Sequence, residues 1–433
     1  MHQYHSEKKE VVVVGGGIAG LTVASLLGRE GYSVTVIEKG KKLGGRAQTK
    51  EKGGFYFNQG AHSFYLSGPG PGKEILAELD VVYHGKSVNR EKQELYFTNQ
   101  FSFFPNNLSR LLEIKGLSSQ AQQEIGNFLG SLGMLDAKQW TGISLSDWME
   151  SSGYHEQTRQ IIEAIVRLGT YSTAVERIDT GFVMKLMNTL IDVWYLDGGW
   201  QTLIDGLEKA ARKVHVKMMN GMKVTSIQKT SSGYDIYLAD RQAIHAEYVV
   251  LTTDPITSSK LIDSEGKYLQ QLADQVEPIY VACLDVALHK LPDSTREFVL
   301  GVESPLYYSV HSSAAKLAPE NGELIHLMKY LLPEKVNKPQ EIRQELEAFF
   351  TLIQPGWQEE LVSTQYLPQM PVAYDLISAN RGGLSGRPSV KVEGLPNLFI
   401  AGDWVGDEGQ LAQASFASAR QVVRAIVSND QSF

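Results

Sequence analysis

The stretch Val11-Val12-Val13-Val14-Gly15-Gly16-Gly17-Ile18-Ala19-Gly20-Leu21 decides how this chain folds. Four β-branched residues in a row predict a buried parallel strand, and a helix is expected directly after the glycines. Gly15, Gly17 and Gly20 form the pattern G-x-G-x-x-G. Gly15 allows the tight turn, Gly17 lets a pyrophosphate approach the backbone, and Gly20 lets the helix pack on the sheet. We therefore expect the N–H groups at the start of the helix to bind phosphate.

A second strand and an acidic residue support this interpretation. Ser33-Val34-Thr35-Val36-Ile37 is typical of a buried strand, and Glu38 follows it. An acid at this position can bind both ribose hydroxyls of an adenosine, and it disfavours a 2′-phosphate. The alternative is a glycine-rich turn with no ligand and an ordinary surface acid. Because strand, glycines, helix, strand and acid occur in the expected order, the pattern favours a dinucleotide site.

The residues after Glu38 narrow the ligand. Lys39-Gly40-Lys41-Lys42-Leu43-Gly44-Gly45-Arg46 contains a Gly-Gly-Arg that is not part of a simple nicotinamide site. With G-x-G-x-x-G-L and the acid, it resembles the extended signature of the flavin-containing amine oxidoreductase superfamily, which includes amine oxidases, protoporphyrinogen oxidases and phytoene-desaturase-like enzymes. The resemblance implies an α/β fold: a Rossmann-like FAD-binding domain, a mixed-sheet substrate domain and a helical insertion. It places Gly44, Gly45 and Arg46 along the FAD pyrophosphate and toward the flavin.

Three later segments extend the resemblance. Asn58-Gln59-Gly60-Ala61-His62 is similar to the segment that turns back under the flavin, with Asn58 where an acid is usual. Val224 stands where a backbone contact to adenine is implied. Gly402-Asp403, with a helix opening at Gly409-Gln410-Leu411, resembles the segment that meets the ribityl chain and the pyrimidine edge of the flavin. The FAD contacts implied in this way are Gly15, Gly17, Ile18, Ala19, Gly20, Glu38, Lys39, Gly44, Gly45, Arg46, Gly60, Ala61, His62, Val224, Gly402, Asp403, Gln410, Leu411 and Ala414.

Composition limits the partners and the chemistry. The chain has 433 residues and a net charge of −8, which argues against nucleic acid. The histidines show no metal-ligand spacing, so we expect no metal. Cys283 is the only cysteine and sits in an apolar strand pattern, so we expect a buried, inert thiol and non-covalent FAD. No apolar run suits a bilayer or a signal peptide, which favours a cytoplasmic enzyme and leaves peripheral membrane contact open.

The periodicity along the chain suggests two interleaved domains. Helical patterns dominate from about 106 to 190, with candidate helices at 118–133, from Ser144, and at 160–168. Strands are expected at 279–288, 306–311, 323–331 and 361–367, with a helix at 339–353. The predicted FAD-binding domain comprises residues 1–85, 195–260 and 386–433. The predicted substrate-binding domain comprises residues 86–194, which include the helical insertion, and 261–385.

Only one dinucleotide pattern is present, so electrons are expected to pass as hydride from an organic substrate to flavin N5. They would then leave to oxygen, a quinone or another acceptor, which the sequence leaves open. Many amine oxidases of the superfamily carry a lysine in the first strand of the substrate domain, but Val281-Ala282-Cys283-Leu284-Asp285-Val286 has none. This favours a phytoene-desaturase-like dehydrogenase that acts on an apolar, isoprenoid compound.

Two other functions stay open at this point. An amine oxidase would use an aromatic cage, for which Tyr366, Tyr374 and Trp404 are candidates. A non-catalytic lipid-binding or escort protein would share the architecture, but it would have no need for Glu38, Arg46 and Asp403. The catalytic base is not identified by the sequence. His62 and Tyr366 are candidates, and for His62 the interpretation as a structural histidine that donates to the backbone is favoured over a catalytic one.

Overall fold

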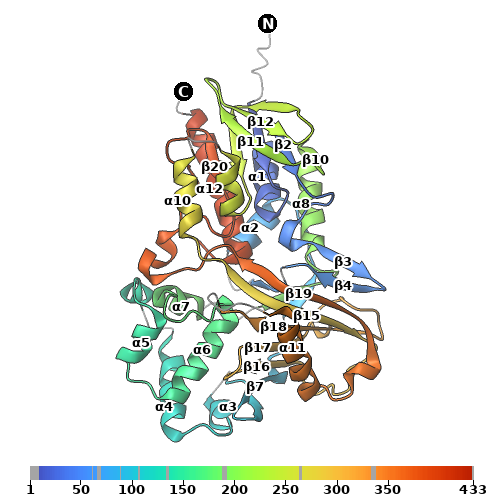
Figure 1. Ribbon diagram of the computed structural model, residues 1–433, viewed down its shortest axis with the longest axis vertical. Coiled ribbons are helices and arrows are strands. Elements are labelled where there is room, and N and C mark those ends of the chain that lie inside the picture. The colour runs from blue at the N-terminus through green and yellow to red at the C-terminus, as the bar shows by residue number, and fades with distance from the viewer. Residues whose placement is uncertain are drawn as a thin grey trace.

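The computed structural model describes residues 9–431, apart from 61, 66–69, 88, 106–107, 133–135, 188–192, 263–265 and 333–337. Figure 1 shows two halves stacked along the longest axis. The upper half contains the parallel sheet and the helices around it, and both chain ends lie there. The lower half contains a large sheet on one side and a group of helices on the other. This arrangement agrees with the expected α/β fold class.

A five-stranded parallel sheet forms the centre of the upper half. Its order is β10-β2-β1-β14-β20, and every neighbouring pair is parallel. Val11 to Val14 are all buried in the middle strand, as a run of β-branched residues between two neighbours requires. The strands are β1 (Glu10–Val14), β2 (Ser33–Glu38), β10 (Lys217–Asn220), β14 (Tyr248–Leu251) and β20 (Leu398–Ile400).

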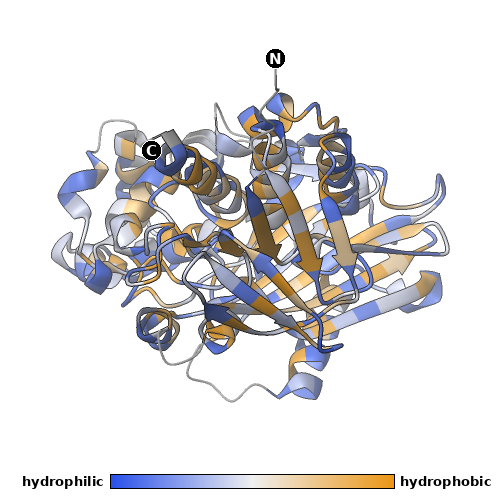
Figure 2. Ribbon diagram, turned by 90° about the horizontal axis from the view of Figure 1, so that it is seen from above, coloured by the Kyte–Doolittle hydropathy of each residue, from blue (hydrophilic) through white to orange (hydrophobic). Residues whose placement is uncertain are grey.

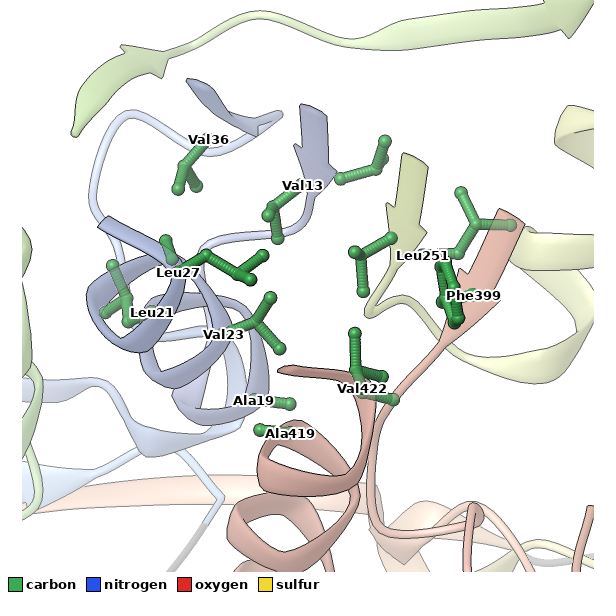
Figure 3. Close-up of a cluster of buried hydrophobic side chains, with 14 of the residues drawn as sticks. Val13, Ala19, Leu21, Val23, Leu27, Val36, Leu251, Phe399, Ala419 and Val422 are labelled. Carbon is green, nitrogen blue, oxygen red and sulfur yellow. The ribbon is translucent and has the colours of Figure 1, made fainter. Parts of the chain in front are cut away.

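Helices cover this sheet, and α1 contacts both α8 and α12. In Figure 2 the strands of the sheet are mostly hydrophobic and lie beside a row of helices. Figure 3 shows Val23 of α1 pointing toward the strands, and Ala19 and Ala419 facing one another where α1 meets α12. These small side chains allow the two helices to approach closely. The helices are α1 (Ile18–Arg29), α8 (Gln201–Lys213) and α12 (Leu411–Gln431).

Asp430, near the end of α12, connects three distant parts of the upper half. Its carboxylate accepts hydrogen bonds from Lys9 Nζ, Tyr32 Oη and Tyr248 Oη. Smaller elements complete this half: an antiparallel sheet of β11 (Val224–Lys229), β12 (Tyr234–Leu238) and β13 (Ala243–Ala246), the hairpin β3 (Thr49–Lys52) and β4 (Phe55–Asn58), and the helices α2 (Pro71–Glu78), α9 (Pro255–Leu261) and α10 (Lys267–Gln275).

A seven-stranded mixed sheet of order β19-β15-β18-β17-β16-β7-β8 forms the lower half. Only β16 and β7 pair in parallel. Helix α11 (Pro339–Ile353) covers one face of the sheet. The strands are β7 (Gln93–Phe97), β8 (Gln100–Phe103), β15 (Ile279–Leu288), β16 (Phe298–Gly301), β17 (Leu306–Val310), β18 (Glu323–Tyr330) and β19 (Leu361–Ala373).

The helical group lies on the other side of this sheet (Figure 1). Its helices are α3 (Leu108–Leu112), α4 (Ser119–Ser131), α5 (Leu145–Ser151), α6 (Glu156–Thr170) and α7 (Thr180–Met187). A small sheet of β5 (Phe64–Tyr65), β9 (Val193–Leu196) and β6 (Gly85–Ser87) adjoins them. Short 3₁₀ turns occupy 45–47, 90–92, 137–140, 311–313, 357–360, 379–381 and 383–386.

Most predicted elements are confirmed, including the strand at 279–288 and the helix at 339–353 with their predicted limits. The strand predicted at 361–367 was too short, because β19 continues to Ala373 through Pro368 and Pro371. A strand tolerates proline when it lies at a sheet edge or contains bulges. β19 meets both conditions, since it is an edge strand and its register against β15 shifts between Val281 and Cys283. The predicted division into two domains stays a prediction.

Candidate cofactor and substrate site

One large cavity runs between the two halves of the molecule, with a volume of about 830 Å³. This size is within the range of cavities that hold cofactors and substrates. Gly15, Gly17 and Glu38 line it at the end nearest the parallel sheet. At the opposite end it is lined by apolar side chains from the helical group and the seven-stranded sheet, among them Phe104, Leu129, Ile165, Leu168, Met328 and Met370.

The three glycines of the first turn have the environments that their predicted roles require. Gly15 has φ +114°, and a Cβ on it would lie 2.6 Å from Thr252 Oγ1. A Cβ on Gly20 would lie 2.0 Å from the carbonyl oxygen of Gly15, so the helix packs directly on the turn. At Gly17 the nearest atom to a Cβ would be Gly44 O, at 3.9 Å, so this side is open to the cavity.

The start of α1 is free to bind an anion. Gly17 is the N-cap residue and provides no side-chain hydrogen bond to the first turn of the helix. The N–H groups there carry a partial positive charge. An open glycine beside uncapped N–H groups matches a pyrophosphate, so the turn fits the FAD that the sequence predicts.

Glu38 is held in place by the backbone around it. Its Oε2 accepts a hydrogen bond from Gly16 N at 2.8 Å, and its Oε1 accepts one from Gly40 N at 2.6 Å. Both bonds orient the carboxylate at the edge of the cavity. Each oxygen keeps a second lone pair, which leaves capacity for ribose hydroxyls.

Arg46 and Asp403 form a paired charge on the cavity wall. Arg46 donates through Nη1 and Nη2 to the two carboxylate oxygens of Asp403, at 3.0 and 2.8 Å. Nη1 also donates to Val372 O at 2.7 Å, and the guanidinium lies 4.1 Å from the centre of the Tyr374 ring. This arrangement connects the first glycine segment, the C-terminal segment and the end of β19 at one point.

The structure brings most of the implied FAD contacts to the cavity. The residues that line it are Gly15, Gly17, Ile18, Ala19, Glu38, Lys39, Gly44, Gly45, Arg46, Gly60, His62, Gly402, Asp403 and Leu411. Ala61 lies outside the described residues.

Four implied contacts do not line the cavity. Gly20 packs against the turn, and Val224 is buried at the start of β11. Ala414 is buried in α12, and the Gln410 side chain donates to Gly169 O at 3.2 Å instead. The roles of all these residues toward FAD stay predictions.

His62 belongs to a buried polar cluster that the sequence did not indicate. Its Nδ1 lies 3.0 Å from Gly60 O, as expected for a structural histidine that donates to the backbone, and its Nε2 lies 3.5 Å from Asp285 Oδ1. Asp285 Oδ1 accepts from His326 Nδ1 at 2.6 Å, and Oδ2 accepts from Gln365 Nε2 at 2.9 Å. The rings of His62 and His326 stack with their centres 3.8 Å apart.

His311 and two tyrosines extend this cluster. The His311 ring stacks on Tyr195 with the ring centres 4.1 Å apart, and it lies 5.0 Å from the ring of His326. The hydroxyls of Tyr195 and Tyr307 lie 3.0 Å apart. His62, His311, His326 and both tyrosines line the cavity between its glycine end and its apolar end.

Burial fixes the charge states in the cluster. It would by itself raise the pKa of Asp285, but His326 and His62 hold that pKa well below its ordinary value. Burial, together with His62, lowers the pKa of His326 to about 4, although Asp285 opposes the shift. Burial also lowers the pKa of His311 and raises that of Tyr195 to about 12. At neutral pH the cluster therefore holds the anion Asp285 beside the neutral rings of His326 and His311.

The contacts of His62, Asp285 and His326 are those of a hydrogen-bonded cluster. The ligand atoms of His62, Asp285 and His326 lie within 4.8 Å of one another, which is close enough for a metal ion. However, both oxygens of Asp285 already accept hydrogen bonds, and two of the rings stack instead of converging on one point. The expectation of no metal stays a prediction.

Tyr366, the other candidate base, lies on the wrong face of the sheet. Its hydroxyl donates to Pro339 O at 2.7 Å, and its ring packs with the cluster under α11. Residues alternate across a strand, so Gln365 faces the cavity side while Tyr366 faces the helix. An aromatic cage of Tyr366, Tyr374 and Trp404 is therefore not formed, because only the last two line the cavity.

The family model for flavin-containing amine oxidoreductases matches residues 18–286, more than half of the chain. The chain belongs to this family. The resemblance noted in the sequence is thereby confirmed, and so is the expected FAD cofactor. Cys283 is buried on β15, and burial raises the pKa of its thiol well above the ordinary value, so this flavin-containing amine oxidoreductase has an inert cysteine.

Curated relatives of this family member include two bacterial enzymes. A 4,4'-diaponeurosporene oxygenase of Staphylococcus aureus (strain USA300) is 24% identical over 324 residues, covering 64% of this chain and 63% of the relative. A 4,4'-diapolycopen-4-al dehydrogenase of Metabacillus indicus is 23% identical over 296 residues, covering 59% of this chain and 58% of the relative. The matched region thus spans less than two thirds of the length of either relative.

Solved structures show the same fold. A putrescine oxidase triple mutant superposes with a TM-score of 0.76 at 14% identity, covering 98% of this chain and 99% of that one. An oxidoreductase from Methanosarcina mazei gives a TM-score of 0.75 at 18% identity, covering 97% and 100%. Among the helices that the structure describes, none has the length and apolar character needed to cross a bilayer.

Proposed function

We propose that this flavin-containing amine oxidoreductase is an FAD-dependent enzyme that removes a hydride and a proton from an apolar organic compound. The observation that carries the proposal is the large cavity, which joins a glycine turn suited to pyrophosphate with an apolar end. A cofactor and a substrate would then lie side by side in one cavity, which would hold the reacting groups together.

The glycine end would hold the cofactor. Gly17 and the start of α1 would bind the pyrophosphate, and Glu38 the ribose of the adenosine. Arg46 and Asp403 would lie beside the ribityl chain, with their charges paired so that neither is left buried alone. Bound FAD would supply the capacity to accept a hydride, which carries the two electrons of the oxidation.

The apolar end would hold the substrate. Its lining of Phe, Leu, Ile and Met side chains suits a hydrocarbon chain, since burying such a chain releases water from apolar surface. The names of the two curated relatives, a 4,4'-diaponeurosporene oxygenase and a 4,4'-diapolycopen-4-al dehydrogenase, support an apolar, isoprenoid-like substrate. A cytoplasmic location, peripheral membrane contact and the electron acceptor stay open.

An anaerobic spectrum tests the proposal. The purified protein should show a flavin absorption band, and an apolar isoprenoid should bleach it. Bleaching by amines with release of peroxide in air would instead identify an amine oxidase, which the missing lysine on β15 disfavours. A colourless protein that FAD cannot reconstitute would contradict the proposal and leave the escort function.

A further inference from the structure

The polar cluster is the feature that a hydrocarbon substrate does not explain. Between the glycine end and the apolar end, the cavity wall carries His62, His311, His326 and the hydroxyl pair of Tyr195 and Tyr307. Burying so many polar groups opposes stability. Buried polar side chains are retained when they bind a polar group of the protein or of a ligand.

The cluster is not satisfied within itself. His311 Nε2 is buried and has no hydrogen-bond partner among the described residues, and His62 Nε2 has only its 3.5 Å contact with Asp285 Oδ1. A network built only for stability pairs its buried members. The incomplete pairing therefore points to a functional role at this position.

The register of the seven-stranded sheet places Asp285, His326 and Gln365 side by side at the centre of the cluster. Asp285 on β15 pairs directly with His326 on β18 and with Gln365 on β19. Cross-strand neighbours on one face lie side by side, so the carboxylate receives a hydrogen bond from each flank. Because His326 Nδ1 donates to the carboxylate, a neutral ring carries its lone pair on Nε2, at the other side of the ring.

We propose that Asp285 and His326 form a base dyad, and that the substrate carries a hydroxyl on its reacting carbon at the end of an apolar chain. This proposal rests on the proposed function and names the substrate class for the same site. In the step, the O–H bond breaks and its proton passes to His326 Nε2. The C–H bond breaks as hydride passes to FAD, and a C=O bond forms. Asp285 balances the imidazolium, whose proton later leaves to water, and oxygen or a quinone takes the two electrons.

The surrounding groups allow this role. The groups that face His326 are Asp285, the rings of His62 and His311, and Tyr307, whose ring centre lies 6.0 Å away. Among these only Asp285 is anionic at neutral pH, and its carboxylate is the group that favours a positive charge on the His326 ring. The tyrosine hydroxyls can donate to the oxygen of the substrate before and after the step.

The test uses matched ligands that share one long isoprenoid chain, one ending in a primary alcohol and one in a methyl group. Binding is measured on the FAD-loaded protein under anaerobic conditions by quenching of tryptophan fluorescence, and flavin bleaching is followed separately. The alcohol should bind about tenfold more tightly than the hydrocarbon, and it alone should bleach the flavin. The variant H326Q should slow bleaching by about a hundredfold or more, the lower range for a general base.

Two further variants separate function from folding. The double variant D285L/H326L replaces the dyad by apolar groups, so it should keep the flavin spectrum and hydrocarbon binding but lose the preference for the alcohol. The exposed His289, which directly follows β15, gives the control H289Q. This variant should behave as the wild type.

The outcomes distinguish this inference from the proposed function. Bleaching by the hydrocarbon but not by the alcohol would overturn the hydroxyl substrate and leave the proposed function intact. Bleaching only by amines, or absence of a flavin, would overturn the proposed function itself. An H326Q variant that folds and bleaches at the wild-type rate, or a stoichiometric metal whose removal stops bleaching, would overturn the dyad.

Discussion

Asp285 and His326 stand directly opposite one another on β15 and β18, and His326 Nδ1 donates to Asp285 Oδ1 at 2.6 Å. The carboxylate and the ring are both almost fully buried. A buried carboxylate of this kind needs its partners, because removing one of them leaves a charge without compensation. The pair therefore makes the stability of the protein depend on pH, in addition to the role proposed for it in the reaction.

Acid should destabilise the protein as the pH falls through the range in which His326 titrates. The pKa of His326 falls from its ordinary 6.5 to about 4 on folding, so between these values the unfolded chain binds a proton that the folded chain does not. Stability therefore decreases as the pH falls through this window, by up to about 3 kcal/mol. Asp285, whose pKa is also lowered, adds to the loss at still lower pH. Thermal unfolding between pH 7 and 4 measures this, and H326Q should flatten the slope while H289Q keeps it.

Substitution by alanine should lower mainly the FAD affinity at Gly17 and mainly the stability of the fold at Gly20. In G17A the new methyl group has no protein atom closer than 3.9 Å, so the free energy of unfolding should change by less than about 1 kcal/mol. FAD affinity should nevertheless fall by at least about tenfold, because the methyl group occupies the approach to the phosphates. In G20A the methyl group would lie 2.0 Å from Gly15 O, which should cost about 1–3 kcal/mol of stability. Flavin titration beside thermal melts separates the two effects, and equal loss of stability in both variants would contradict the geometry.

Arg46 should not be replaceable by lysine. The guanidinium bonds both oxygens of Asp403 and also Val372 O, which one ammonium group cannot reproduce at the same distances. R46K should therefore lower FAD retention by about tenfold, measured as flavin released on dilution. The control is R343K, which makes the same change in a partly exposed pair with Glu347 and should retain FAD like the wild type.

Tyr366 should be dispensable for chemistry. Its hydroxyl donates to Pro339 O, on the face of the sheet that α11 covers. Y366F should reduce the flavin at the wild-type rate and lose no more than about 1 kcal/mol of stability, the usual contribution of one hydrogen bond. A strong loss of reduction rate with unchanged stability would return Tyr366 to the list of candidate bases.

The cofactor end of the site could be predicted from the sequence because its signals are local. The strand, the three glycines and Glu38 lie within one short stretch, and each has a backbone or charge role that neighbouring residues indicate, whereas the role of Arg46 was implied by the resemblance to the family. Asp403 was implied only by the resemblance to the family, which places an acid after the C-terminal strand. The long strand β19 was not, because its prolines are tolerated only at an edge, and edge position is a property of the whole sheet.

The pairing of Asp285 with His326 could not be predicted from the sequence, for a different reason. His62, Asp285 and His326 come from three separate segments, and only the register between β15 and β18 brings the last two together. A signal did exist, since Asp285 interrupts the apolar run from Val281 to Leu288, and a buried charge requires a partner. The sequence does not identify that partner, because Asp285 and His326 are 41 residues apart and are brought together only by the pairing of strands in the folded sheet.

The parallel sheet joins strands that are synthesised far apart in time. β1 lies at residues 10–14, whereas β20 and α12 lie at residues 398–431, and Asp430 connects α12 to Lys9, Tyr32 and Tyr248. A ribosome therefore releases the first phosphate-binding turn long before it releases the strand and helix that enclose it. We therefore expect the early segment to lack its neighbours, and to bind the cofactor poorly, until residues 398–431 have been synthesised.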